Sequence, residues 1–275
     1  MLLGMSARKR ADDPRSSEEL LEAHRIERLA EETHWDALWA LRDRGTRHEF
    51  DMGRRLTESD HPRDREIGAD LLAQLGAGER VFQDESVEIL IRLLDDPDPA
   101  VVNSAAVGLG HRGDPRAVGP LVKLASRSEE AVRLGVAIGL LTHEDESAVL
   151  TLITLSSDPA VDVRSWATFG LGTQIDVDTP AIRDALTARL EDEDPEVRGE
   201  ALVGLACRHD ERVLRALPAE LEKADVVVLA LEAAETLAVA WLVPHLERLL
   251  VSLGPDANEY FRQQLIRAIA ACRGE

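Results

Sequence analysis

Residues 194–205 read Asp-Pro-Glu-Val-Arg-Gly-Glu-Ala-Leu-Val-Gly-Leu, and the chain repeats the pattern of this stretch. An Asp-rich turn comes first, Val197 follows it, an Ala lies four residues after the Val, and a Leu lies eight residues after it beside a Gly. Clear copies also start at Val101, Val132 and Val163, and weaker ones at Ile67, Val226 and Phe261. Successive starts are 29 to 35 residues apart. A fixed period of this length indicates a helical repeat array.

Each copy predicts a pair of helices. The starting residue and the positions four and eight residues later, here written +4 and +8, fall on one face of a helix. A second amphipathic segment lies between successive starts, as in Val118, Leu121, Val122 and Leu124. We therefore expect a hairpin of helix A followed by helix B in every copy. Asp-Pro and Thr-Pro pairs supply an N-cap acceptor and a proline suited to the first helical turn. No window alternates with a period of two over the length of a strand, so we expect no sheet.

The pattern resembles that of the HEAT-repeat family, and most closely the short HEAT-like repeats of bilin lyases. The resemblance rests on the Asp-Pro turns, on the Val-Arg pairs and on the Ala…Leu-Gly endings, and it is strongest over residues 61–210. It implies an all-α fold, a right-handed α-solenoid of about six to seven helical hairpins with helix B on the concave face.

The same comparison implies one continuous array with specialised ends. We expect a flexible tail over residues 1–17 and a single repeat domain over 18–275. Within that domain the N-terminal cap and first helices occupy 18–60, regular repeats occupy 61–210, and degenerate repeats with a C-terminal cap occupy 211–275. Trp35 and Trp39 are one helical turn apart and fit either a cap packed on the first copy or an aromatic binding spot. The true start is left open between Met1 and Met5.

Charge narrows the choice of partner. The 275 residues hold 32 basic and 52 acidic side chains, a net charge of −20. Binding to nucleic acid depends on neutralising phosphates, so this excess disfavours it. The densest arginine cluster, between Arg42 and Arg65, is interleaved with carboxylates. Two cysteines at unrelated positions, together with the lack of a signal peptide or membrane span, favour a cytoplasmic protein without membrane contact.

No motif predicts a catalytic, cofactor-binding or metal-binding residue. His48-Glu49 and His143-Glu144 resemble the iron-binding pairs of deoxyhypusine hydroxylase, a HEAT-like enzyme, but a di-iron site needs several such pairs at equivalent helix positions. No nucleophile elbow or glycine-rich phosphate loop is present. We therefore expect no cofactor and no small-molecule site.

One apolar strip does stand out on helix B. Position +6 points away from the predicted core, yet it is apolar in consecutive copies. With apolar residues at +2 and +3, the predicted partner-binding strip consists of Val107, Leu134, Ile138, Trp166, Phe169 and Val203. Either the strip receives a partner, or helix B is more deeply buried than a helical wheel shows. Contiguous exposed apolar surface and an aromatic residue both favour an interaction site.

The sequence therefore predicts a non-enzymatic scaffold or adaptor that binds a protein partner on the concave face, with a monomer as the favoured state. The alternative is a bilin-lyase-like or other modifying-enzyme subunit acting with a partner chain, and nucleic-acid binding ranks third. Two further patterns concern packing. The resemblance to HEAT repeats implies that the Arg after each start (Arg133, Arg164, Arg198) bonds a carbonyl or an Asp of a neighbouring turn, for which Asp158, Asp162 and Asp194 are available. A Gly at +7 in four copies indicates close helix approach.

Overall fold

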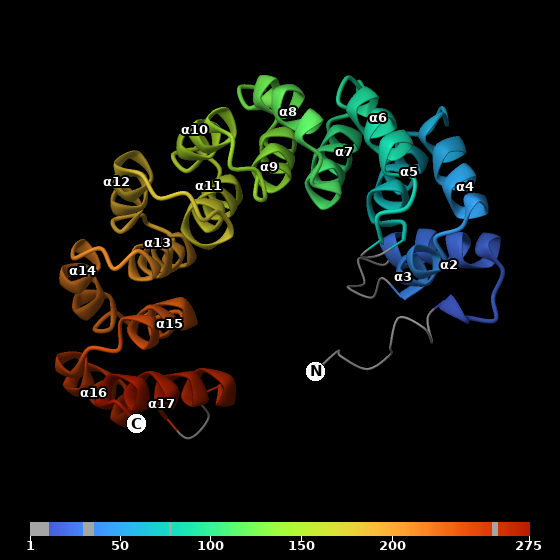
Figure 1. Ribbon diagram of the computed structural model, residues 1–275. Coiled ribbons are helices and arrows are strands. Elements are labelled where there is room, and N and C mark those ends of the chain that lie inside the picture. Colours follow the sequence, from blue (N-terminus) through green and yellow to red (C-terminus); the bar gives the residue numbers. More distant parts are fainter. Residues whose placement is uncertain (1–10, 30–35, 77–78, 255–257) are drawn as a thin grey trace. The chain divides into compact units, whose positions relative to one another are not determined.

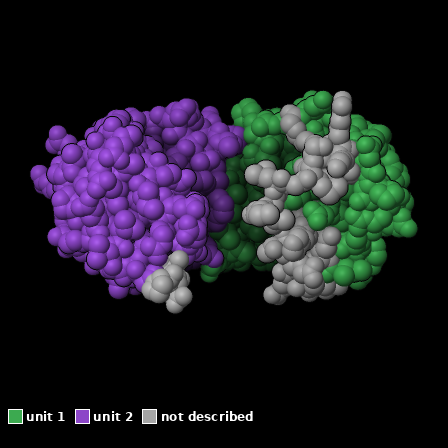
Figure 2. All heavy atoms as spheres, turned by 90° about the horizontal axis from the view of Figure 1, so that it is seen from below, with its two compact units in different colours: residues 1–139 green, residues 140–275 purple. Residues whose placement is uncertain are grey.

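The computed structural model describes residues 11–29, 36–76, 79–254 and 258–275. Every regular element in these ranges is a helix and none is a strand, which confirms the all-α solenoid class (Figure 1). None of the described helices combines the length and apolarity that a membrane span requires. The chain divides into two compact units, residues 1–139 and 140–275, which Figure 2 colours green and purple. We call them unit 1 and unit 2.

Short helices follow one another along both units. Those of unit 1 are α2 (Ser17–Leu29), α3 (Asp36–Arg44), α4 (Arg47–Thr57), α5 (Pro62–Gln74), α6 (Gln83–Leu93), α7 (Pro99–Arg112), η2 (Pro115–Ala117), α8 (Val118–Leu124) and α9 (Glu130–Gly139). Those of unit 2 are α10 (Glu146–Leu155), α11 (Val161–Phe169), η3 (Gly170–Gln174), α12 (Pro180–Arg189), α13 (Pro195–Cys207), α14 (Arg212–Glu220), α15 (Val228–Leu237), η4 (Ala240–Leu242), α16 (Val243–Ser252) and α17 (Glu259–Arg273).

The helices pair into A/B hairpins whose B helices stack. From α4 to α17 the described hairpins are α4/α5, α6/α7 and α8/α9 in unit 1, and α10/α11, α12/α13, α14/α15 and α16/α17 in unit 2. Helix α7 packs between α5 and α9, and in unit 2 the order of stacked B helices is α11, α13, α15, α17. The hairpins agree with the predicted repeat number.

The repeat positions form the core. Val101, Ala105 and Leu109 of α7 are fully buried, as are Val197 and its +4 and +8 residues in α13. The weaker copies follow the same rule at +4, where Ala230 and Leu265 are fully buried, but their starting residues Val226 and Phe261 are only half-buried. The Asp-Pro turns cap the helices as predicted: Asp98 accepts the backbone N–H of Ala100 at 2.9 Å, and Asp194 accepts those of Glu196 and Val197.

Glycine at +7 marks the closest approach between repeats. A Cβ on Gly139 would lie 2.5 Å from the carbonyl oxygen of Ala106 in α7, and one on Gly204 would lie 2.6 Å from the Cα of Gly172. Cβ atoms at Gly108 and Gly170 would each meet a neighbouring side chain at less than 3.0 Å. The predicted close packing is therefore confirmed in all four copies, against backbone at Gly139 and Gly204 and against side chains at Gly108 and Gly170.

Arginines and carboxylates tie neighbouring turns together. Arg164 donates to both carboxylate oxygens of Asp192, at 2.9 and 3.0 Å, and to the carbonyl of Asp158. Arg198 binds Glu220 in the same way and also the carbonyl of Asp192. Arg133 donates to the carbonyls of Arg127 and Ser128. These bonds confirm that each of the three arginines reaches a carbonyl or a carboxylate of a nearby turn, although Asp192 and Glu220 were not among the expected acceptors.

The N-terminal predictions are only partly covered by the described residues. Residues 1–10 of the predicted tail and Trp35 lie outside them, whereas Trp39 is half-buried on α3. Arg44 donates to the carbonyl of Asp13 at 2.8 Å and to the hydroxyl of Ser17 at 2.7 Å. These bonds attach the segment before α2 to the end of α3.

The glycine contacts predict opposite effects of two alanine substitutions in unit 1. Gly139→Ala destabilises the protein by about 1–3 kcal/mol, because its methyl group collides with backbone that cannot move without separating α7 from α9. Gly119→Ala, in α8, is neutral or stabilises by up to about 1 kcal/mol, because a Cβ there meets nothing within 4 Å. Urea unfolding followed by circular dichroism measures both; equal effects of the two substitutions would contradict the packing argument.

Candidate functional site

The six residues of the predicted strip are divided equally between the two units. In unit 1, Val107 lies on α7, and Leu134 and Ile138 lie on α9. All three side chains are half-buried. The adjacent B helices α7 and α9 thus carry partly accessible apolar side chains, as the helical wheel predicted.

In unit 2 the strip is less uniform. Trp166 on α11 is 40% exposed and Phe169 is half-buried, but Val203 on α13 is only 8% exposed. Val203 differs from the expectation because α13 has a B helix on each side, where the longer side chains of Phe169 and Glu232 occupy the same +6 position. A short valine side chain between two longer side chains is covered. The accessible apolar surface of this helix face is therefore centred on α11.

Trp166 and Phe169 form one aromatic unit. Their ring centroids are 5.7 Å apart and the ring planes meet at 83°, an edge-to-face arrangement. The three-residue spacing places both side chains on one side of α11. Edge-to-face pairs of this kind are favourable because the positive edge of one ring meets the negative face of the other. Phe169 thus supports the indole of Trp166 while leaving much of it accessible.

Acidic side chains lie on the B helices that follow α11 in the stack. Glu200 on α13 occupies the +3 position, as Trp166 does on α11, and Glu232 occupies +6 on α15. Adjacent packed helices lie about 8–10 Å apart, so Glu200 is the lateral neighbour of Trp166. Burial, and then the nearby charges of Glu196 and Glu232, raise the pKa of Glu200 from 4.5 to about 7. An aromatic pair therefore lies beside a carboxylate whose charge is poorly compensated within the protein.

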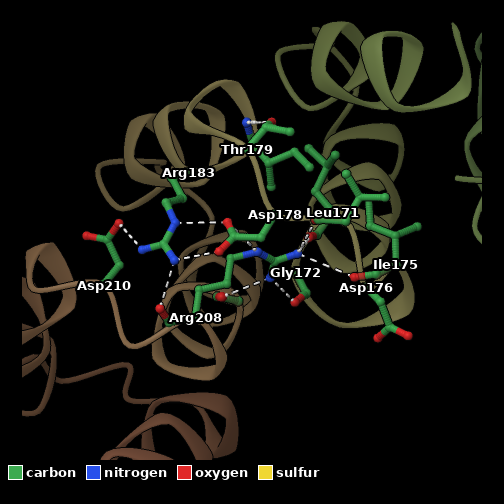
Figure 3. Close-up of polar contacts among 12 residues, drawn as sticks. Leu171, Gly172, Ile175, Asp176, Asp178, Thr179, Arg183, Arg208 and Asp210 are labelled. Carbon is green, nitrogen blue, oxygen red and sulfur yellow. Dashed lines mark hydrogen bonds and ion pairs between the residues drawn. The ribbon is translucent and has the colours of Figure 1, made fainter. Parts of the chain in front are cut away.

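The end of α11 has an unusual backbone. The helix continues without a break into a five-residue π-helical turn, η3, which contains Gly170 and Gly172. Carbonyls near a helix end lack intrahelical donors. Figure 3 shows Arg208 extending from α13 toward this turn, where it donates to the carbonyls of Leu171 at 2.7 Å and Gly172 at 2.5 Å. The guanidinium thus holds the segment that follows the aromatic pair.

A second arginine organises the loop after this turn. Arg183 on α12 bonds both carboxylate oxygens of Asp178, at 2.8 and 2.5 Å, and also reaches Asp210 at 3.1 Å (Figure 3). Asp178 in turn lies 3.6 Å from Nε of Arg208. The pKa of Asp210 is held well below its usual range, chiefly by its hydrogen bonds to Arg212. These charges are internally paired and support the backbone, so they are not the candidate site itself.

The role of Arg208 recurs at an equivalent position that the sequence analysis missed. Arg208 is the +11 residue of its copy, and Arg112, the +11 residue of α7, is almost fully buried. Nε of Arg112 donates to the carbonyl of Leu72 in α5 at 2.9 Å, and Cys272, the +11 residue of α17, directs its thiol to the carbonyl of Ala234 in α15. Aligning the copies beyond +8 would have shown a donor at +11 in these three repeats.

The two His-Glu pairs have structural partners. Glu49 forms a capping box with Thr46 and accepts the hydroxyl of Ser17 at 2.5 Å. Glu144 accepts the backbone N–H of Asp176 at 2.7 Å. In the described parts of the chain, no group of three or more His, Cys, Asp or Glu side chains is placed to hold a metal ion.

Comparison with known protein families agrees with the repeat geometry. The model of HEAT repeats matches residues 52–142 and 148–238. The chain belongs to the HEAT-repeat family. Both matched segments consist of the A/B hairpins described above, and their boundary falls near the division between the two units.

Escherichia coli YibA is similar to this chain in sequence and structure. Protein YibA of strain K12 is 42% identical over 82 residues, which span 30% of this chain and 29% of YibA. The X-ray structure of E. coli YibA superposes with a TM-score of 0.64 and 27% identity, covering 96% of this chain and 94% of the YibA chain. The local sequence match thus spans less than a third of YibA, whereas the shared helical architecture extends over nearly all of it.

Two other solved structures are also similar to this chain. An archaeal HEAT-like repeat protein from Thermococcus onnurineus NA1 has a TM-score of 0.52 at 14% identity, covering 95% of this chain and 98% of that one. The CpcE–CpcF complex of phycocyanin lyase from Nostoc sp. PCC7120 has a TM-score of 0.49 at 18% identity, covering 81% of this chain and 94% of that one. The first likeness concerns the fold alone, and the second is too distant to support an argument about activity.

Removing the guanidinium of Arg208 is expected to destabilise unit 2. Arg208→Met costs about 2–4 kcal/mol in the free energy of unfolding, because several carbonyls at the end of α11 lose their donor in a buried place. Arg248→Met is the control: Arg248 is exposed and bonds Glu222 at 3.0 Å, so its loss costs less than about 1 kcal/mol. Chemical denaturation compares the two, and a loss for Arg208→Met no larger than the control contradicts the assignment.

The raised pKa of Glu200 predicts a pH-dependent gain from Glu200→Gln. Between pH 4.5 and 7 the unfolded chain loses the Glu200 proton while the folded protein retains it, so the wild-type protein loses stability as the pH rises through this window. The glutamine variant has no titratable group at this position, so it does not lose stability in this way. We expect it to be more stable than wild type at pH 8 and nearly equal at pH 4.5. Urea unfolding at both pH values measures the difference in stability between the variant and wild type. If this difference is the same at pH 4.5 and at pH 8, the raised pKa is contradicted.

Proposed function

We propose that this protein is a non-enzymatic HEAT-repeat scaffold that binds a partner protein through the B-helix face of unit 2, at Trp166 and Phe169. The observation that carries the proposal is the exposed indole of Trp166, supported edge-to-face by Phe169. An indole is large, rigid and partly apolar, so a partner that covers it buries a large surface area at little cost in conformational entropy. Tryptophan is accordingly enriched among the residues that dominate binding energy at protein interfaces.

The charges around the pair favour a cationic partner segment. Glu200 occupies the position of α13 that corresponds to Trp166 on the adjacent α11, and burial, followed by the nearby charges of Glu196 and Glu232, disfavours its ionised form. A Lys or Arg side chain next to an apolar side chain on the partner satisfies both features at once. A cation near the indole face gains further from the ring quadrupole. We therefore infer a basic segment that carries at least one apolar residue.

In unit 1 the half-buried Val107, Leu134 and Ile138 form a milder apolar area on α7 and α9. We propose that this area also contacts a partner. It contributes less binding energy than the aromatic pair, because none of its three side chains is aromatic. We further propose a cytoplasmic location, in line with the charge and cysteine pattern. The enzymatic alternative, a bilin-lyase-like or other modifying-enzyme subunit, rests on resemblance of the fold alone.

The proposal predicts that one tryptophan matters for binding and another does not. Trp166→Glu removes the exposed ring and introduces repulsion, so it lowers partner affinity by about 100-fold or more. Trp241→Glu is the matched control, because Trp241 is 47% exposed in the same unit but lies on η4. Affinity capture from the native host with quantitative mass spectrometry identifies proteins retained by wild type and by the control.

Calorimetry with the purified candidate then measures affinity for all three proteins. Equal binding by Trp166→Glu and wild type overturns the proposed site. Far-ultraviolet circular dichroism checks that each variant remains helical, and Trp166→Ala serves as a milder replacement if the glutamate variant unfolds.

A further inference from the structure

A groove in unit 2 lies between the A helices α10 and α12. Val149, Leu150 and Ile153 of α10 line one wall, and Val177 and Ala181 line the other. The volume of the groove is about 410 Å³. Ligand pockets span about 300–1,000 Å³. The groove therefore has room for a few side chains of a bound segment, but not for a folded domain.

Leu150 departs from the pattern of the A helices at this groove. It lies two residues before the fully buried Leu152 and is 52% exposed. The other A helices between α6 and α16 each contain a fully buried leucine at the equivalent position. The residues two before these leucines are all exposed, and in chain order they are Glu88, Gly119, Asp184, Arg215 and Pro244. Among these described helices, a large apolar side chain occupies this solvent-facing position only at the groove.

The wall opposite α10 comes from a longer repeat. In the copies that start at Val101, Val132 and Val197, the fully buried leucine of the next A helix lies 20 residues after the start. Leu186 of α12 lies 23 residues after Val163. The added length falls between the end of α11 and α12, in the segment that forms this wall. Insertions in a repeat protein map to loops, which often lie on a binding face.

Polar contacts hold this wall in place beside α10. Glu144, which precedes α10, accepts the backbone N–H of Asp176 at 2.7 Å. The hydroxyl of Thr179 accepts the backbone N–H of Ile182 at 3.3 Å and caps α12. Figure 3 shows Asp176 and Thr179 at the two ends of the loop, with Asp178 bonded to Arg183 between them. The groove is therefore preformed, so a partner gains affinity by avoiding the entropic cost of ordering the loop.

The charge at the groove favours a basic partner. Between Arg133 and Arg164 the sequence holds five carboxylates and no Lys or Arg. Glu144 and Glu146 line the groove, and both are exposed. Glu146 bonds no Lys or Arg of the described residues. A cationic side chain is attracted here, whereas a second copy of this chain, with its net charge of −20, is repelled.

We propose that the groove between α10 and α12 binds a short segment of a partner protein in which one apolar side chain is flanked by lysine or arginine. The apolar side chain packs against Leu150 and Val177, and the basic side chain lies near Glu146. This site uses different side chains from the aromatic pair of α11, so it is a second docking site beyond the proposed function.

Short random peptides displayed on phage and selected on the full chain supply the probes. The peptides retained by wild type are expected to carry an apolar residue beside Lys or Arg. Leu150→Glu and Glu146→Lys each weaken binding of the synthetic peptides by about 10-fold or more, measured by fluorescence polarisation. Val251→Glu is the matched control, because Val251 is 87% exposed on the A helix α16, and it leaves the affinity unchanged.

Trp166→Glu separates this site from the proposed function, because it leaves the affinity for these peptides unchanged. The proposal is overturned if no peptide is enriched, if the enriched peptides bind Leu150→Glu as well as wild type, or if they carry acidic residues beside the apolar one. Circular dichroism checks that the variants remain helical, and Leu150→Ala replaces the glutamate variant if it unfolds.

Sedimentation equilibrium tests a second copy of the chain as the occupant. Wild type is expected to remain monomeric at the concentrations used for peptide binding. A wild-type dimer that Leu150→Glu converts to a monomer would assign the groove to a second copy and overturn the proposal.

Discussion

The structure depends on how closely the backbones of neighbouring B helices approach each other. At Gly139 and Gly204 the backbone of one helix lies against the backbone of the next, with no room for a methyl group. This contact sets the distance between repeats, and the other interactions fit around it. The buried residues at the repeat start, +4 and +8 fill the space between helices A and B, while donors at +11 reach carbonyls of the preceding B helix because that helix is so near.

The same closeness explains how the charges are used. Arg164, Arg198, Arg183 and Arg208 are largely buried or half-buried and bond carboxylates or carbonyls of nearby turns. A substantial part of the basic charge is thus committed to holding the array together. The chain holds 52 acidic and 32 basic residues, so the excess of acidic side chains remains for the surface. Against this background an exposed tryptophan beside Glu200 is chemically distinctive, since it combines a large apolar group with a carboxylate that burial already disfavours.

Two sides of the B helices then acquire separate roles. The side with the +3 and +6 residues carries the aromatic pair of α11, and the side with +2 and +9 packs against the following repeat, as the close neighbours of Gly199 and Gly172 show.

The sequence by itself determined the helical hairpins, their number, the buried face of each helix and the close approach at the glycines that occupy +7 in four copies. These follow from the number of repeats, from local periodicity and capping, and from the absence of a Cβ in glycine. It also placed Trp166 and Phe169 on the outward side of helix B. Only the tertiary structure decided that Val203 is covered and Trp166 is not, that Arg164 bonds Asp192, and that Arg208 supports the end of α11. Periodicity shows the direction in which a side chain points. Its exposure and its partners depend on the length of the neighbouring side chains and on the spacing of the neighbouring helices.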